Sequence, residues 1–329
     1  MLKPIATCSQ RYRLPKVAPL FVLAGLAASG APSPAQATSI YIDEFNATLN
    51  GSPLFDDTFN QNTTLVGGTG ATVASGVNFA GTSTGANYFV HGSIPEQTAN
   101  NGQALLDTSN GTVVTQPDPF FPVISEVNAN LETSTSSTAA SALTQATSFT
   151  VTGLYDLSLP NVVGGSDVLD LNNRYAVNNN MGNVLQIRLR DCAPGVGLCG
   201  ALSGPVVQFV FLNYITNSDT LISEFALSAA DLADPQFLFE FTKAANTNII
   251  DACYAFGTGN TLQSFNAAPT CFASTDSSTN VFTTQAGGDT VRGAFGAFDP
   301  VSTPEPSSLP LMAAGLLALG CCAFRRVIR

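Results

Sequence analysis

Phe237-Leu238-Phe239-Glu240-Phe241-Thr242 places a phenylalanine at every second position, with Leu, Glu and Thr between them. Successive side chains of a β-strand point to opposite faces of its sheet, so this spacing predicts a strand whose Phe face is buried. Residues 185–190, with the sequence LQIRLR, alternate in the same way and predict a second strand, its Gln and Arg side chains facing water. A period of two residues therefore decides the fold class.

The pattern extends along much of the chain. Ile250, Ala252, Tyr254 and Phe256 repeat the alternation, and residues 206–212 are almost continuously apolar, as expected for a strand buried on both faces. Gly, Asn, Thr and Ser fill the intervals. One short helical turn is predicted at residues 228–233, with Ser228 capping it against Asp231.

Short strands separated by turn-rich spacers predict an all-β fold, an antiparallel β-sandwich of the jelly-roll or lectin-like kind. We expect one such domain over residues 38–300. Residues 133–146 are dominated by Ser, Thr and Ala and mark a candidate internal boundary. This segment is interpreted as a long loop, an exposed edge strand or a linker between two β modules.

The N-terminus has the features of a secretory signal peptide. Four basic residues precede residue 17, residues 17–28 are apolar and rich in small side chains, and Ala35-Gln36-Ala37 forms an A-x-A cleavage site. Residues 1–37 are therefore predicted to be removed after Ala37 during export, which leaves Thr38 as the first residue of the mature chain.

The C-terminal segment, residues 303–329, has three parts in a fixed order. Pro304-Glu305-Pro306 comes first, an apolar run follows at 309–324, and the chain ends in a basic cluster made of Arg325, Arg326 and Arg329. Sixteen residues span about 24 Å as a helix, and snorkelling arginines extend this toward a hydrocarbon core of about 30 Å. A transmembrane helix at 309–324 with its basic end in the cytoplasm is predicted.

This tail resembles the PEP-CTERM sorting signal of exported Gram-negative proteins. The resemblance covers about a tenth of the chain and does not extend to the β-rich body. It implies processing by an exosortase-type membrane protease or transpeptidase, export linked to exopolysaccharide, and a transient hold in the inner membrane. After cleavage near Pro304, the body would lie at the cell surface or outside the cell.

The body is strongly acidic once the two ends are set aside. Residues 38–303 contain five Lys and Arg against twenty-two Asp and Glu, a formal net charge of −17. Such a field repels nucleic acid and anionic lipid, so neither is expected as a partner. The acids are scattered along the chain, which favours a role in solubility over a specific cation site.

Four cysteines fall within the body: Cys192, Cys199, Cys253 and Cys271. An even number in an exported chain predicts two disulfides. Three connectivities are open, and the simplest joins Cys192 to Cys199 and Cys253 to Cys271. A zinc site is not favoured because no C-x-x-C motif is present and His91 lies far upstream of the cysteines.

Catalytic signals in the body are weak. Residues 81–85 match the G-x-S-x-G elbow, but the segment that follows is strand-like rather than helical, so we expect a hairpin at 81–85. His91 precedes most of the acids, whereas the hydrolase order places the histidine last. We therefore expect His91 to be an ordinary surface or turn histidine. Glycoside hydrolysis needs only two carboxylates. The candidates are Glu44, Glu96, Glu126, Glu132, Glu224 and Glu240. None lies in a recognisable motif, the chain has no Trp for sugar stacking, and we do not expect an enzyme.

Calcium is the most plausible cofactor, although none is required. Asp167 and Asp170 belong to a stretch rich in hard oxygen ligands that we expect to be a Gly-flanked loop, and Asp56, Asp57 and Asn60 form a second set. Neither set completes a known calcium loop, and turn formation is the favoured explanation for both.

Two classes of function stay open. The first is a non-enzymatic surface or matrix protein associated with exopolysaccharide or biofilm. The alternative is a carbohydrate-binding or carbohydrate-cleaving module exported by the same route, with Tyr88 as a candidate exposed aromatic.

Overall fold

The fold is seen in a computed structural model of the chain. It describes residues 38–60, 64–66, 72–73, 86–97, 102–116, 122–133, 143–160, 162–173, 183–214, 216–282 and 290–301. Within these residues the chain is built of β-strands, with two short 3-10 turns, η2 (Thr108–Asn110) and η4 (Asp231–Ala233).

The strands follow one another as β1 (Ser39–Leu49), β2 (Ser52–Asp57), β3 (Thr64–Val66), β4 (Thr72–Val73), β5 (Ala86–His91), β6 (Ser93–Gln97), β7 (Gln103–Asp107), β8 (Thr112–Thr115), β9 (Val123–Thr133), β10 (Phe149–Asp156), β11 (Ser166–Asn172), β12 (Asn183–Cys192), β13 (Gly204–Asn213), β14 (Ser218–Ala226), β15 (Gln236–Lys243), β16 (Ile250–Gly257), β17 (Thr270–Ser274) and β18 (Arg292–Pro300).

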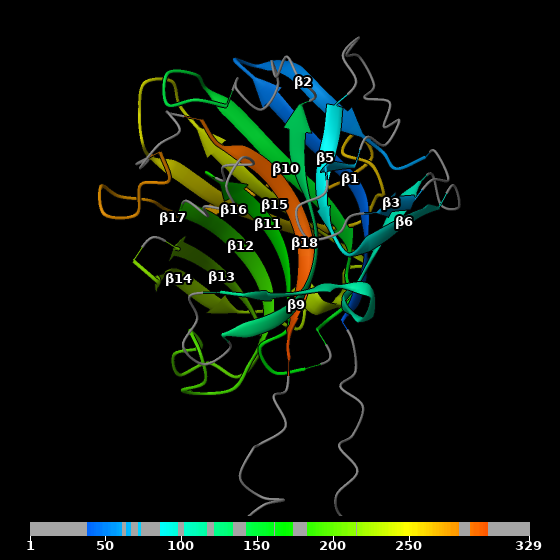
Figure 1. Ribbon diagram of the computed structural model, residues 1–329, viewed down its shortest axis with the longest axis vertical. Coiled ribbons are helices and arrows are strands. Elements are labelled where there is room, and N and C mark those ends of the chain that lie inside the picture. Colours follow the sequence, from blue (N-terminus) through cyan, green and yellow to red (C-terminus); the bar gives the residue numbers. More distant parts are fainter. Residues whose placement is uncertain are drawn as a thin grey trace, which may run out of the picture. The chain divides into compact units, whose positions relative to one another are not determined.

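Two sheets contain all of these strands (Figure 1). The first sheet has the order β17-β16-β15-β10-β1-β7-β6-β3, with β2 paired to β1. The second has the order β14-β13-β12-β11-β18-β9-β5-β4, with β8 paired to β9. Every pair within the described residues is antiparallel. The first strand β1 and the last strand β18 both lie in the interior of a sheet.

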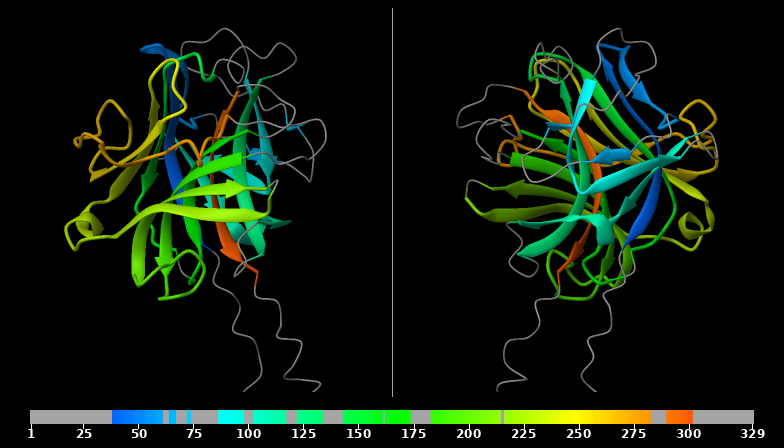
Figure 2. Two further views of the ribbon diagram at one scale, coloured as in Figure 1. Left: turned by 90° about the vertical axis from the view of Figure 1, so that its left-hand side faces the viewer. Right: turned by 45° about the vertical axis from the view of Figure 1, so that its right-hand side comes forward.

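The inner faces of the sheets meet in one aromatic core, which makes the body a β-sandwich of two layers (Figure 2). Phe295 of β18 lies at its centre, with its ring centroid 4.9 Å from that of Phe45 on β1 and 5.6 Å from that of Tyr88 on β5. Tyr155 of β10 stacks on Phe237 of β15 at 4.9 Å. These rings are fully buried, and apolar burial of this kind is the main favourable term in folding.

The predicted all-β fold is confirmed, and so are its most periodic strands. The Phe-rich stretch is β15, and Phe237, Phe239 and Phe241 all face the core. Residues 206–212 lie in β13, which is buried on both faces as expected. The predicted helical turn is also present, because Ser228 N–H donates to the Asp231 carboxylate at 2.8 Å and Asp231 N–H donates to Ser228 Oγ at 3.2 Å.

The prediction that one face of residues 185–190 is open to water is wrong. These residues lie in β12, where Arg188 and Arg190 are both 0% exposed. Arg188 stacks over the Phe298 ring at 5.1 Å and donates from Nε to the Gln186 amide oxygen at 2.6 Å. Alternation identifies the strand correctly, but it does not show whether a further layer covers the polar face.

Strands from both sides of residues 133–146 share both sheets. β1 pairs with β10 in the first sheet, and β9 pairs with β18 in the second. The core is therefore continuous from the first strand to the last. No helix among the described residues is long and apolar enough to cross a membrane; residues 309–324 lie outside this part of the chain.

Replacing Phe295 with Ala should lower the free energy of unfolding by about 3–5 kcal/mol, because the substitution empties the centre of the aromatic core. Denaturant titration measures this loss. Val113→Ala is the control, since Val113 is 63% exposed, and it should change stability by about 0.5 kcal/mol or less. Equal effects of the two substitutions would contradict the assigned core.

Candidate functional site

Most residues of the two processing signals lie outside the described part of the chain. These are Ala35 and Ala37 of the cleavage site, Pro304, Glu305 and Pro306 of the sorting motif, and Arg325, Arg326 and Arg329 of the basic end. Thr38, the expected first residue of the mature chain, is described and is buried.

Both expected disulfides are present, with the simplest of the three connectivities. Cys192 at the end of β12 bonds to Cys199 across seven positions of sequence, and the loop is held against β13 because Gln208 donates from Nε2 to the Leu198 carbonyl at 3.2 Å. Cys253 and Cys271 are opposite one another on β16 and β17 and close the second bond. Disulfides persist in oxidising compartments and are rare in the cytosol.

The first calcium candidate does not have the expected loop conformation. Asp167 and Asp170 lie in the central strand β11, between β12 and β18. Because they are three positions apart in a strand, their side chains point to opposite faces of the sheet. They are therefore not brought together at one cation, and burial raises the pKa of Asp167 well above its usual range.

In the second calcium candidate, the Asp57 carboxylate already accepts hydrogen bonds from within the fold. Asp57 is 2% exposed and accepts hydrogen bonds from Phe59 N–H at 3.0 Å and from the Tyr88 hydroxyl at 2.9 Å. Burial raises its pKa to about 7. Among the described residues, no group of three or more His, Cys, Asp or Glu side chains is placed to hold a metal ion. Tyr88, expected at the surface, is instead fully buried.

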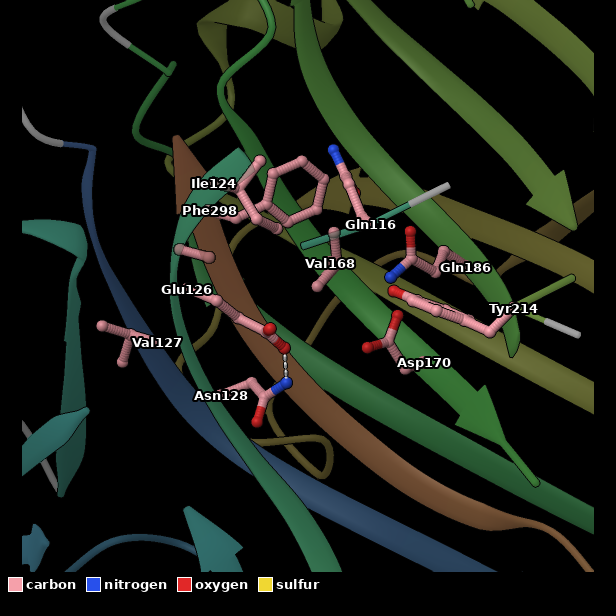
Figure 3. A pocket seen from close by; sticks show the side chains of 11 residues that line it. Gln116, Ile124, Glu126, Val127, Asn128, Val168, Asp170, Gln186, Tyr214 and Phe298 are labelled. Atoms are coloured by element: carbon pink, nitrogen blue, oxygen red, sulfur yellow. Dashed lines mark hydrogen bonds between the residues drawn. The ribbon is translucent and has the colours of Figure 1, made fainter. Parts of the chain in front are cut away.

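A chain of polar side chains crosses the outer face of the second sheet, and Figure 3 shows its end at Asn128 and Glu126. Asn172 of β11 donates to Asn130 at 2.5 Å, Asn130 donates to Asn128 at 2.9 Å, and Asn128 donates to the Glu126 carboxylate. Glu126 also lies 3.5 Å from His91 Nδ1. His91 ends β5 directly before the bend at Gly92, and its side chain is buried beside a carboxylate. Of the expected surface or turn position, the surface one is therefore wrong.

A small hollow opens beside this chain of amides. Its lining comes from β9, β11, β12 and β18, and Figure 3 shows Glu126, Asp170 and Gln186 around it with the ring of Tyr214. The volume is about 10 Å³, roughly what one water molecule occupies. The hollow can therefore hold a water between polar groups, and it is too small for a sugar ring.

A second polar group lies on the outer face of the first sheet, where β1 is irregular. A β-bulge between Ile42 and Glu44 opposes Tyr155 and Leu154 of β10, which brings the consecutive acids Asp43 and Glu44 to the same region of that face. Gln103 bridges Asp43 and Asp156 through hydrogen bonds of 2.7 and 2.9 Å.

Burial raises the pKa values of both bulge acids. The pKa of Asp43 rises to about 7, and that of Glu44 rises to about 8, with the negative charge of Asp56 as a further cause for Glu44. Glu44 also accepts a hydrogen bond from Leu262 N–H at 2.7 Å, so the loop after β16 covers the acid.

The glutamates considered for glycoside hydrolysis are spread over three regions. Two of them, Glu44 and Glu240, lie on the outer face of the first sheet. Two others, Glu126 and Glu224, lie on the outer face of the second sheet. Glu96 of β6 lies on the same face of its strand as the core residue Ile94. Glu240 accepts from Thr152 at 3.3 Å and Glu224 accepts from Gln208 at 3.1 Å. The side chain of Glu132 and residues 81–85 are outside the described set.

Comparisons with family models, with curated proteins and with solved structures find no match to this chain.

The polar side chains of β9 were not identified as a group from the sequence, although the sequence contains a signal for them. Glu126, Asn128 and Asn130 alternate with Val127, Ala129 and Leu131, which is the same period of two that identified β15. The bulge acids carried no such signal, because a bulge changes the face of a residue without changing the sequence pattern around it.

The bulge acids make stability depend on pH in a defined direction. Their pKa values are raised in the folded state, so the stability linked to them is complete below the unfolded values near 4 and is lost as pH rises toward 7 to 8. The unfolding midpoint should therefore be lower at about pH 8 than at about pH 5. Glu44→Gln should make this decline shallower in denaturant titrations across the range; an unchanged decline would contradict the buried carboxylate.

Proposed function

We propose that this chain is the precursor of an exported surface or matrix protein that is sorted through its C-terminal tail. The observation that carries the proposal is the order of the tail: Pro304-Glu305-Pro306, the apolar run at 309–324, and the terminal arginines. The signal peptide at the other end supports the same route.

The two disulfides support a destination outside the cytosol. Both join cysteines of the body, and structural disulfides of this kind are formed in oxidising compartments. The acidic composition of residues 38–303 supports a soluble body that neither nucleic acid nor anionic lipid would hold.

The tail acts as a temporary hold. The two prolines lack a backbone N–H and restrict the chain, so the box would separate the body from the apolar segment. The terminal arginines would keep the end of the chain in the cytoplasm while the body lies on the other side of the inner membrane. An exosortase-type enzyme would then cut near Pro304 and release the body to the cell surface or to exopolysaccharide.

The body itself is proposed to be non-enzymatic, with a sandwich of the jelly-roll or lectin-like kind. Strands distant in sequence are neighbours in both sheets, as long crossovers of these folds require, with β1 beside β10 and β9 beside β18. The candidate carboxylates are spread over three regions and the described hollow holds about one water. Solubility or weak adhesion within the matrix fits these features.

Changing Glu305 to Ala should block processing in a host that has the exosortase. The variant should accumulate as a membrane-bound precursor, because the recognition box is broken while the apolar run is intact. Membrane fractionation and blotting against the body measure this. Ser307→Ala lies just outside the box and is the matched control; equal release of the Glu305 variant and the parent would refute the role of the box.

The alternative is a body that binds or cleaves carbohydrate. Sugar rings stack on exposed aromatic faces, and no aromatic side chain of the described residues is among the exposed ones. A glycan array probed with the exported protein should be flat, and polysaccharide incubated with it should release no reducing ends. Saturable binding to one defined sugar would overturn the non-enzymatic matrix role in favour of this alternative.

A further inference from the structure

Thr38 is held at the start of β1 by a carboxylate from the other end of the body. Its backbone N–H donates to Asp299 Oδ2 at 2.6 Å, and its hydroxyl donates to Asp299 Oδ1 at 2.5 Å. One residue therefore contacts both oxygens of an aspartate that is 261 positions away, near the end of β18. Thr38 and Asp299 are 1% and 6% exposed.

Neighbouring residues complete the enclosure. Thr108 of η2 donates its hydroxyl to Asp299 Oδ2 at 2.5 Å and its N–H to the Thr38 carbonyl at 3.0 Å. Gly165 approaches so closely that a Cβ there would lie 2.5 Å from Asp299 Oδ1 and 3.1 Å from Thr38 Oγ1. The position of Thr38 is therefore fixed by three elements.

A second carboxylate lies on the same inner face of the second sheet. Asp167 is fully buried, and neither of its oxygens has a hydrogen-bond partner in the described part of the chain. Burial and the charge of Asp299 raise its pKa. No Lys, Arg or His of the described residues pairs with Asp299 or Asp167. Buried carboxylates without a counter-cation are costly, and among the described residues these two carboxylates have none.

We propose that Asp299, with Thr108 and Asp167, forms a binding site for the α-ammonium group of Thr38 that cleavage of the signal peptide creates. The site rests on the proposed export route, because the cation exists only after that cleavage. A signal peptidase hydrolyses the Ala37–Thr38 bond with one water. Ala37 keeps the new carboxylate, and the new amine of Thr38 takes up a proton.

The cleavage changes the donor without moving it. In the precursor, Thr38 nitrogen carries one N–H and no charge. In the mature chain the same nitrogen carries three N–H groups and a positive charge, at the distance from Asp299 that suits a charge-assisted hydrogen bond. The Asp299 carboxylate gains its counter-ion, and the negative potential around Asp167 falls. Maturation at the N-terminus thereby stabilises the junction of β1 and β18.

The test uses the processed protein purified after export and begins with the identity of its first residue. The variant inserts one Gly between Ala37 and Thr38, which keeps the A-x-A site and the net charge but moves the ammonium one residue away. Asp299→Asn removes the carboxylate charge with little change of shape, and Asp234→Asn is the matched control on the η4 turn, whose side chain forms no hydrogen bond among the described residues.

Two measurements decide the outcome. Each acylation rate of the N-terminal amine by a small reagent is divided by the rate of the same chain when unfolded, which removes the intrinsic difference between a Thr and a Gly amine. This relative rate should be about tenfold or more lower for Thr38 of the parent than for the Gly-extended chain. The Gly extension should lower the thermal midpoint by about 4 °C or more in the parent and in Asp234→Asn, and by much less in Asp299→Asn.

The possible failures are distinguishable. A mature chain that begins elsewhere than Thr38 overturns the docking together with the expected cleavage. A chain that begins at Thr38 but has a freely reactive amine overturns the docking alone and leaves export unaffected. If Asp299→Asn does not fold, the acylation rates of the parent and the Gly-extended chain still decide.

Discussion

The contact between β1 and β18 is the constraint on which the rest of the structure depends. Phe45 and Phe295 meet edge to face between the sheets, and each belongs to an interior strand, so the two layers are joined through the first and last strands of the body. Thr38, which directly precedes β1, is bound to Asp299 near the end of β18. The first and last described residues of the body, 38 and 301, therefore lie close together.

This closeness bears on the proposed processing of the chain at both ends. The two proposed cleavage points lie just before Thr38 and shortly after residue 301, and these two described residues are at the same end of the body. The body would then be released by two cuts made near one another in space, although they are far apart in sequence.

The sequence was sufficient for the fold class and for several strands, because burial on the inner faces imposes a period of two that Phe237, Phe239 and Phe241 display clearly. It was insufficient to predict whether the outer faces of the sheets are covered. Arg188 and Arg190 alternate with apolar residues just as solvent-facing side chains do, yet both are buried. What covers a sheet comes from distant segments, and no local pattern encodes it.

The same distinction applies to the candidate sites. Asp167 and Asp170 suggested a loop because Asp and Asn favour turns, but central position in a sheet overrode that preference and separated the two carboxylates to opposite faces. The paired cysteines were predictable because sequence separation alone favours the short connections. The Thr38–Asp299 contact was not predictable, since it joins residues 261 positions apart.

The proposed processing is tested most directly by the intact mass of the protein recovered from the medium and cell surface of its own host. Processing at both ends predicts one soluble species that begins at Thr38, ends near Pro304, and is four hydrogens lighter than the reduced chain because of its two disulfides. A species that remains in the membrane and retains residues 309–324 would contradict it.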